Sequence, residues 1–231
     1  MIPFKDNIPS RRYPVITVTL ILVNVTVFIY EFSVEPSQQL DFFSVYGLIP
    51  AKLYMIGHQP VDVFTGLLRS LITSMFLHGG FIHLLGNMWY LWIFGDNVED
   101  RMGSVRFLFF YLLCGTLASM VHILFNLSSE VPSIGASGAV AGVLGAYLVS
   151  YPFARVLTLL PFFFIWVVEL PAILVLGSWF VVQIFNGTAS IDASSGVMGG
   201  IAWWAHVGGF LSGMLLIASF ARRPVRRYYW E

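Results

Sequence analysis

Charged residues are scarce in this chain. They make up 10% of its 231 residues, whereas about 25% is usual for a soluble domain. Hydrophobic residues reach 58% and the mean hydropathy is +0.81. This composition excludes an ordinary soluble domain and predicts an all-α, polytopic membrane protein. Since one span takes about 20 residues plus a connection, the length suits one bundle of about half a dozen helices without a second domain.

Cysteine and net charge are also nearly absent. The one cysteine, Cys114, lies inside an apolar run, which excludes an internal disulfide framework and a cysteine-rich metal site. The 12 basic and 12 acidic residues cancel, so no global basic surface indicates a nucleic-acid partner. No pattern in the sequence indicates a cofactor.

Six apolar runs predict six transmembrane helices, with a long external first loop and a short central fourth helix. The expected spans are residues 13–32, 80–95, 105–125, 136–151, 170–186 and 201–220. The expected connections are a cytoplasmic segment 1–12, an external loop 33–79 containing short helices, a polar turn at 96–101 and a basic cytoplasmic tail 221–231. The fourth run gives roughly 24 Å of helix against a hydrocarbon core of about 30 Å, so its start lies below the outer surface.

Positive charge predicts the orientation of the bundle. Six spans put both termini on one side, which then receives every lysine and arginine except Lys52 and Arg69. The positive-inside rule makes that side cytoplasmic, and we expect the cell (inner) membrane. The first run resembles a signal peptide in outline, but it is longer than a usual signal core and ends in Tyr30-Glu31-Phe32. We therefore expect a retained anchor.

The stretch 155–186 is longer than one span needs. Pro161 and Pro171 interrupt it, with Glu169 between them. We expect its first part, rich in Phe and Val, to be an interfacial strand or loop, and the fifth helix to begin near Leu170. An interfacial position for Glu169 is favoured over a functional carboxylate inside the membrane, because an unpaired charge in hydrocarbon is costly.

The candidate functional residues are the few polar ones expected at membrane depth. Ser137 stands in Gly135-Ala136-Ser137-Gly138 at the head of the fourth run. Taken alone, a serine among glycines more often marks a turn or a close helix contact than a nucleophile. His83 and Asn87 are four residues apart, so they share one helix face, whereas His78 belongs to the preceding loop. His206 lies near the start of the last helix.

Two chemical interpretations of these residues compete. Histidines bind metals, but His78 and His83 lack the i, i+4 spacing of a zinc helix and no carboxylate accompanies His206, so a metal site is not favoured. Nucleophilic catalysis is favoured, because a serine hydroxyl needs a neighbouring imidazole to take its proton. The nucleophile elbow of soluble hydrolases is excluded, since position 139 is Ala and no strand precedes the serine.

Small residues predict how Ser137 and His206 meet. Both the fourth and the last helix carry a face of glycines, and such faces let two backbones approach closely. These glycines are Gly138, Gly142 and Gly145 on the fourth helix and Gly209 and Gly213 on the last. Packing the two faces together would bring His206 to Ser137. The side chains of His83 and Asn87, with the backbone N–H of Ser137, would then serve as oxyanion donors.

Taken together, these motifs resemble the rhomboid intramembrane serine proteases over nearly the whole chain. The set comprises Gly135-Ala136-Ser137-Gly138, His83 with Asn87, and Ala205-His206-x-x-Gly209-x-x-x-Gly213. Each motif is weak alone, but the set in this order is specific. The resemblance implies a Ser137–His206 dyad without an acidic third member, oxyanion donors at His83 and Asn87, and a structural role for His78. It also matches Gly95-x-x-x-Glu99-x-x-x-Gly103 to the family's loop after the second helix, where Glu99 is structural.

Two positions depart from the family pattern. Some members carry an aromatic ring four residues after the serine, stacked on the catalytic histidine, whereas this chain has Ala141. Trp203 and Trp204 are the candidates to hold His206 instead. The family's Trp-Arg pair in the first external loop is reduced here to Arg69, with no tryptophan before it.

The resulting prediction is a serine endopeptidase that cleaves peptide bonds in or next to the transmembrane segments of membrane proteins. Its partners would be those substrates and the lipid bilayer, and the resemblance implies substrate entry past the fifth helix near Trp179 and Phe180. One alternative is a non-proteolytic relative that binds membrane clients, although such relatives typically lack the serine or the histidine. Another is a small transporter, but no inverted repeat relates the two halves. The sequence does not indicate the oligomeric state or the substrate.

Overall fold

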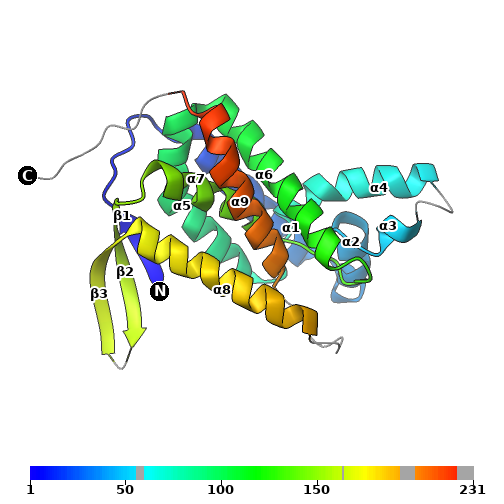
Figure 1. Cartoon of the computed structure of the whole chain (residues 1–231). Helices are drawn as coiled ribbons and strands as arrows, with labels where there is room; N and C mark the ends of the chain where they lie inside the picture. Colours follow the sequence, from blue (N-terminus) through cyan, green and yellow to red (C-terminus); the bar gives the residue numbers. More distant parts are fainter. Residues whose placement is uncertain (56–59, 163, 193–200, 223–231) are drawn as a thin grey trace, which may run out of the picture.

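The chain folds into a bundle of helices with one small sheet at its edge (Figure 1). The computed structural model describes residues 1–55, 60–162, 164–192 and 201–222. The helices are α1 (Val15–Ser33), α2 (Gln39–Tyr46), α3 (Lys52–Met55), α4 (Pro60–Thr73), α5 (Phe81–Met102), α6 (Ser104–Phe125), α7 (Ser137–Ser150), α8 (Ala172–Asp192) and α9 (Trp203–Phe220), with 3₁₀ turns η1 (Pro36–Gln38) and η2 (Ser74–Phe76). The strands are β1 (Ile2–Asp6), β2 (Arg155–Phe162) and β3 (Phe164–Pro171).

Within the described ranges, four helices are long and apolar enough to cross a membrane: α1, α6, α8 and α9. This confirms a helical, polytopic membrane protein. Helix α7 has 14 residues and is shorter than a span, as expected for the fourth run. Helix α5 is long enough but ends in polar turns, so the count of six spans stays a prediction.

Helix α7 lies at the centre of the bundle (Figure 1), where α5, α6, α8 and α9 all contact it. Its sequence is apolar or small on every side, which is the pattern of a helix buried all round. Large buried rings, including Phe94, Phe110, Tyr111 and Phe210, fill the space around it. Ser137, the first residue of this central helix, is half-buried.

The predicted polar turn at residues 96–101 is wrong, because this stretch forms the last turns of α5. The helix ends only at Gly103, whose φ of +82° is readily adopted by glycine. Helix α5 continues through its polar residues because they find partners. The same region was matched to a family loop through Glu99.

Glu99 caps the first turn of α1. Its carboxylate accepts hydrogen bonds from the backbone N–H groups of Ile16 and Thr17 at 3.0 and 2.8 Å, and from the hydroxyls of Thr17 and Ser104 at 2.9 and 2.6 Å. The first N–H groups of a helix have no partner within the helix, and a negative charge there is stabilising. Glu99 therefore binds α5, α6 and α1 together.

The stretch after α7 forms a β-hairpin, in agreement with the strand expected there. Strands β2 and β3 are antiparallel, and the N-terminal strand β1 joins the other edge of β2. The sequence analysis left residues 1–12 without structure, so β1 was missed. It is fixed to the helices by Trp89, whose indole N–H donates to the carbonyl of Pro3 at 2.6 Å, and by the Asp6 carboxylate, which accepts from Tyr147 and Asn97.

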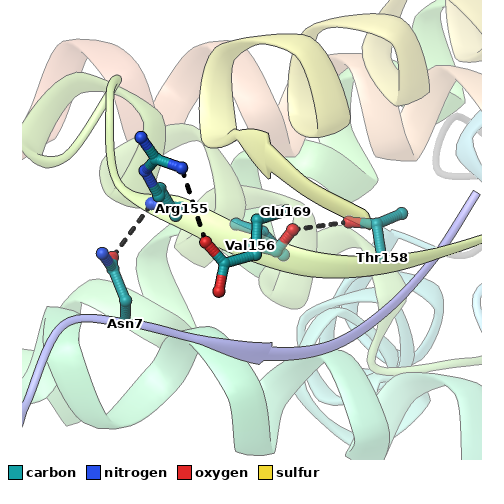
Figure 2. Close-up of polar contacts among 5 residues, drawn as sticks. All are labelled: Asn7, Arg155, Val156, Thr158 and Glu169. Atoms are coloured by element: carbon teal, nitrogen blue, oxygen red, sulfur yellow. Dashed lines mark hydrogen bonds and ion pairs between the residues drawn. The ribbon is translucent and has the colours of Figure 1, made fainter. Parts of the chain in front are cut away.

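Glu169 lies on β3 and pairs with Arg155 of β2 (Figure 2). Their charged atoms are 3.5 Å apart, and the two side chains are 55% and 60% exposed. The backbone N–H of Arg155 also donates to the Asn7 side chain at 2.9 Å. A paired, exposed carboxylate agrees with the interfacial interpretation. Helix α8 begins at Ala172, close to the expected Leu170, but extends to Asp192 instead of ending at residue 186.

The basic residues lie at opposite ends of the bundle, as their positions in the sequence predict. At one end, the carbonyl of Arg101 accepts from the N–H of Arg222 at 3.0 Å, and Arg106 reaches the carbonyl of Phe220 at 3.4 Å. At the other end, the helices α2, α3 and α4 occupy the predicted external loop (Figure 1). Lys52 and Arg69 lie there. The basic tail from residue 223 onward lies outside the described residues.

Candidate active site

Ser137 is the first residue of α7, and the segment before it is tied to the first loop. Leu48 and Ser133 exchange two backbone hydrogen bonds of 3.0 and 2.7 Å, and the N–H of Gly135 donates to the carbonyl of Ser74 at 2.9 Å. These contacts hold the chain in place immediately before the helix. Because Ser137 begins α7, its backbone N–H has no acceptor within the helix ladder and is available as a donor.

The side chains of His83 and Ser137 both lie close to Gly135. Its φ of +129° is a conformation that L-residues with a side chain rarely adopt. A Cβ atom at Gly135 would lie 2.8 Å from both Cε1 and Nε2 of His83 and 3.6 Å from the Ser137 hydroxyl oxygen. Glycine is therefore required here both by the backbone and by the His83 ring, which packs directly against it.

The glycine faces of α7 and α9 are in backbone contact. A Cβ atom at Gly209 would lie 2.0 Å from the carbonyl oxygen of Gly138, and one at Gly213 would lie 1.9 Å from that of Gly142. A Cβ atom at Gly138 would in turn meet Ala205 at 3.7 Å. The turn of α9 that carries His206 thus lies against the turn of α7 that begins with Ser137.

The structure brings Ser137 and His206 to one region without a hydrogen bond between them among the residues it describes. His206 is 8% exposed, and the residue before it, Ala205, lies against Gly138, the residue after Ser137. Catalytic hydrogen bonds are often long or misaligned before substrate binds, and a serine hydroxyl rotates about χ1. The arrangement is consistent with a dyad that tightens on substrate binding.

The group that holds His206 in the absence of an aromatic at Ala141 is Gln183. The Nδ1 atom of His206 lies 2.8 Å from the side-chain carbonyl oxygen of Gln183 on α8. Sequence reasoning missed this residue. The signal available was a polar amide in the middle of an apolar run, the same criterion that selected the histidines.

Of the two predicted tryptophans, one contacts His206 and the other does not. The Trp203 ring lies edge-on to His206 with centroids 6.1 Å apart. The other candidate, Trp204, instead stacks its ring on Phe125 with the centroids 3.8 Å apart. Trp179 of α8, expected only as part of an entry route, lies 5.7 Å from the His206 ring.

Asn87 supplies a free donor close to His83. Its side-chain nitrogen is buried and has no hydrogen-bond partner in the described part of the chain. A buried amide without a partner is costly, so such a group in a protein interior needs a reason. One turn separates Asn87 from His83 on α5, which places both donors on the face that looks toward the start of α7.

His78 supports His83 from the loop before α5, where it was expected. Its backbone N–H donates to both carboxylate oxygens of Glu31 at 3.2 Å, and its ring packs edge-to-face on His83 with centroids 5.2 Å apart. Burial, together with the nearby His83, lowers the pKa of His78 to about 4. His78 is therefore neutral at physiological pH and serves as packing for the His83 ring.

Glu99 was grouped with the residues near the site, but it lies at the far end of α5. It follows His83 by four helical turns and more, which corresponds to roughly 24 Å along the helix axis. Its function is the capping of α1 described above. The guanidinium carbon of Arg69, the one visible member of the family's Trp-Arg pair, lies 5.3 Å from the ring centre of Tyr46.

The fold is that of a polytopic helical membrane protein in which the turn that begins with Ser137 and the turn that carries His206 lie on two helices in backbone contact. Residues 65–223 match the Rhomboid domain family, and the chain belongs to the rhomboid family. Its helices and this family membership make it an integral membrane protein.

Three relatives illustrate the similarity. RHOMBOID-like protein 1 of Arabidopsis thaliana is 35% identical over 159 residues, which cover 69% of this chain and 36% of the relative. Rhomboid protein 1, mitochondrial, of Saccharomyces cerevisiae is 32% identical over 63% of this chain and 40% of the relative. Rhomboid protease GluP of Bacillus subtilis is 46% identical over 34% of this chain and 15% of the relative. The match thus covers less than half the length of each relative. The prediction that this protein lies in the cell membrane is not supported by these relatives, since the yeast protein is named as mitochondrial.

Proposed function

We propose that this protein is an intramembrane serine endopeptidase that cleaves membrane proteins in or next to their transmembrane segments. The observation that supports the proposal is the backbone contact between α7 and α9, which sets the turn of α9 that carries His206 against the turn of α7 that begins with Ser137. Family membership, and a relative named as a protease, support the same reaction class.

The reaction follows from the groups present. His206 takes the proton of the Ser137 hydroxyl as the serine oxygen attacks the scissile carbonyl, and then gives that proton to the leaving amine. The oxyanion would be met by the backbone N–H of Ser137 and by the side chains of Asn87 and His83. His206 next takes a proton from water as the water oxygen attacks the acyl-enzyme, and returns that proton to the Ser137 oxygen as the C–O bond to serine breaks and the product acid leaves.

The proposed orientation puts both termini in the cytoplasm or in the compartment equivalent to it. The end of the bundle with Arg101, Arg106 and Arg155 would face that compartment, and the helices α2 to α4 would face the other side. Substrates would be proteins with a transmembrane segment that reach Ser137 from the bilayer. A cysteine introduced in the exposed part of α2, at Leu40, should react with impermeant maleimide only from the external side.

Labelling with a fluorophosphonate probe tests the proposed chemistry. In proteoliposomes the wild type should be labelled and should cleave a single-span membrane protein, and Ser137→Ala should do neither. His206→Ala should lower both rates at least about 100-fold, since a positioned general base contributes about 10²- to 10⁴-fold. Ser150→Ala is the matched control, because Ser150 is a buried serine at the opposite end of α7.

Two outcomes would contradict the proposal. Full activity in Ser137→Ala or His206→Ala would exclude the dyad. A correctly folded wild type that is neither labelled nor able to cleave would favour the alternative of a non-proteolytic, client-binding rhomboid protein.

A further inference from the structure

The Nδ1 side of His206 is occupied by a single fixed partner. Gln183 is 4% exposed and lies on α8, a helix that contributes neither Ser137 nor the proposed oxyanion donors. Its side-chain oxygen is 2.8 Å from His206 Nδ1, and its side-chain nitrogen donates to the carbonyl of Trp179 at 3.1 Å. Both ends of the amide are therefore used.

The contact with Trp179 fixes which way the amide points. A backbone carbonyl only accepts hydrogen bonds, so the end of Gln183 that faces Trp179 must be the NH₂ group. The end that faces His206 is then the carbonyl oxygen, which also only accepts. His206 must consequently carry a proton on Nδ1, and its Nε2 keeps the lone pair in the neutral ring.

We propose that Gln183 is a positioning residue that makes the proposed Ser137–His206 dyad a Ser-His-Gln system. Its side-chain carbonyl selects the Nδ1–H tautomer of His206 and fixes the plane of the ring, so that Nε2 is the base. This inference rests on the proposed protease function. It assigns to a neutral amide on α8 the role that a carboxylate has in Ser-His-Asp triads.

A neutral amide suits this position better than a carboxylate. When His206 takes the Ser137 proton on Nε2, the ring becomes an imidazolium with N–H groups on both nitrogens, and the Gln183 carbonyl dipole points at the Nδ1–H. A carboxylate would stabilise the imidazolium more strongly, but burying it without another partner is costly. Gln183 orients the ring at the cost of a weaker stabilisation of its charged form.

The rings around His206 complete its support. Trp179 lies beside it at a tilt of 32° and Trp203 meets it edge-on at 86°. The ionisable side chains that interact electrostatically with His206 are His83 of α5 and His122 of α6. Gln183 of α8 contacts His206, Ser137 begins the adjacent helix α7, and neither of these side chains titrates near neutral pH. A substitution at position 183 that changes the pKa of His206 should therefore change the dependence of the labelling rate on pH.

Two substitutions test the role of Gln183 in the full-length protein in proteoliposomes. Gln183→Leu removes the acceptor at similar volume, and Gln183→Glu keeps an acceptor but adds charge. Ser178→Ala on the same helix is the control, since among the described residues the Ser178 hydroxyl donates only to the carbonyl of Val175 within α8. The readouts are the rate of fluorophosphonate labelling against pH, the kcat and KM of cleavage, and the thermal melting temperature.

Gln183→Leu should lower the labelling rate and kcat by about 10- to 100-fold, the usual effect of losing a partner that orients a functional histidine. KM and the melting temperature should change little. Gln183→Glu should keep substantial activity, with its pH profile displaced to higher pH because a carboxylate favours the imidazolium. Ser178→Ala should match the wild type.

If Gln183→Leu is labelled at the wild-type rate and with the wild-type pH profile, the positioning role of Gln183 is overturned while the protease proposal stays intact. If Gln183→Leu does not fold, an unshifted pH profile in Gln183→Glu would overturn it equally. A folded wild type that is not labelled at all would instead overturn the protease proposal, and the Ser-His-Gln system with it.

Discussion

Two of the interfaces of helix α7 are built by different means. Toward α9, its backbone touches backbone, with Gly142 and Gly213 in direct contact. Toward the sheet, its far end uses a polar side chain, because the hydroxyl of Tyr147 donates to the carboxylate of Asp6 in β1. The first interface positions the serine and the histidine, and the second attaches the N-terminal strand.

The difference lies in how each interface responds to change. Backbone contact leaves no side chain that can move aside, so any added atom must displace a helix. Polar side-chain contacts can be lost singly, each at a cost of about 1 kcal/mol, and they respond to pH. We therefore expect substitutions at the α7–α9 interface to lower stability most, and substitutions toward the sheet to lower it least.

The largest effect is expected for Gly213→Val. Its Cβ would lie 1.9 Å from the carbonyl oxygen of Gly142, so α9 must separate from α7. We expect loss of folded, labelled protein, at more than about 3 kcal/mol of destabilisation by overpacking. Thermal melting in detergent and fluorophosphonate labelling would show it.

Gly177→Ala is the matched control for that experiment. Gly177 lies on α8, and no described part of the chain outside its own helix lies within 4 Å of an added Cβ. Alanine is the better helix former, so the variant should be as stable as the wild type or up to about 1 kcal/mol more stable. An equal loss of melting temperature and labelling in Gly177→Ala and Gly213→Val would contradict the conclusion that close backbone contact at Gly213 is what makes its substitution destabilising.

A smaller effect is expected for Phe180→Ala at the interface between α8 and α9. The rings of Phe180 and Phe210 stack with centroids 4.4 Å apart and an angle of 15°. An aromatic pair contributes about 0.5–1.5 kcal/mol beyond its buried area, and neighbouring side chains can adjust. The melting temperature should fall measurably but far less than in Gly213→Val. A larger loss than in Gly213→Val would reverse the order proposed here.

The attachment of β1 should depend on pH through Asp6. Burial, reinforced by Asp96, raises the pKa of Asp6 from 3.8 to about 7 despite its hydrogen bond with Tyr147. The folded state then binds a proton that the unfolded state has already released, so stability should decrease as the pH rises from about 4 to 7. Asp6→Asn should flatten this decrease.

Melting temperatures measured from pH 4 to pH 8 test the effect of Asp6. Asp41→Asn is a suitable control, because Asp41 is exposed on α2 at the other end of the molecule. An identical pH dependence in the wild type and in Asp6→Asn would show that the carboxyl is ionised throughout.

The smallest effect is expected for Glu169→Gln. The ion pair with Arg155 is 3.5 Å long and more than half exposed (Figure 2). Exposed pairs contribute about 0–1 kcal/mol, so stability and labelling should stay close to the wild type. A loss of activity comparable to that in Ser137→Ala would revive the alternative of a functional carboxylate.

The order of the elements was predictable because hydropathy in a membrane protein is a strong signal. The ends of α1, α6, α7 and α9 agree with the expected spans to within about two residues. The last turns of α5 and the strand β1 were missed for a common reason. Their polar residues resemble a loop until the partners that satisfy them, such as Thr17 for Glu99 and Tyr147 for Asp6, are known.

The candidate site shows the same limit. Gly135 and the glycines of α7 and α9 indicated in the sequence where two helices approach, because only glycine allows such contact. Nothing in the spacing of Gln183 or Trp179 connects them to His206, since side chains on different helices have no fixed offset along the chain. The sequence could not decide between Trp203 and Trp204, because closeness to His206 along the chain does not determine which way a ring points.

The sequence by itself determined that this chain is a helical membrane protein of the rhomboid kind, with Ser137 and His206 as its candidate reacting residues. The lengths of hydrophobic runs and the spacing of glycines are local properties, so they can be identified from the sequence alone. Only the tertiary structure decided that Gln183 holds His206, that Glu99 caps α1 and that β1 closes the sheet. Each of these depends on a hydrogen bond between distant segments, whose geometry exists only after the helices have packed.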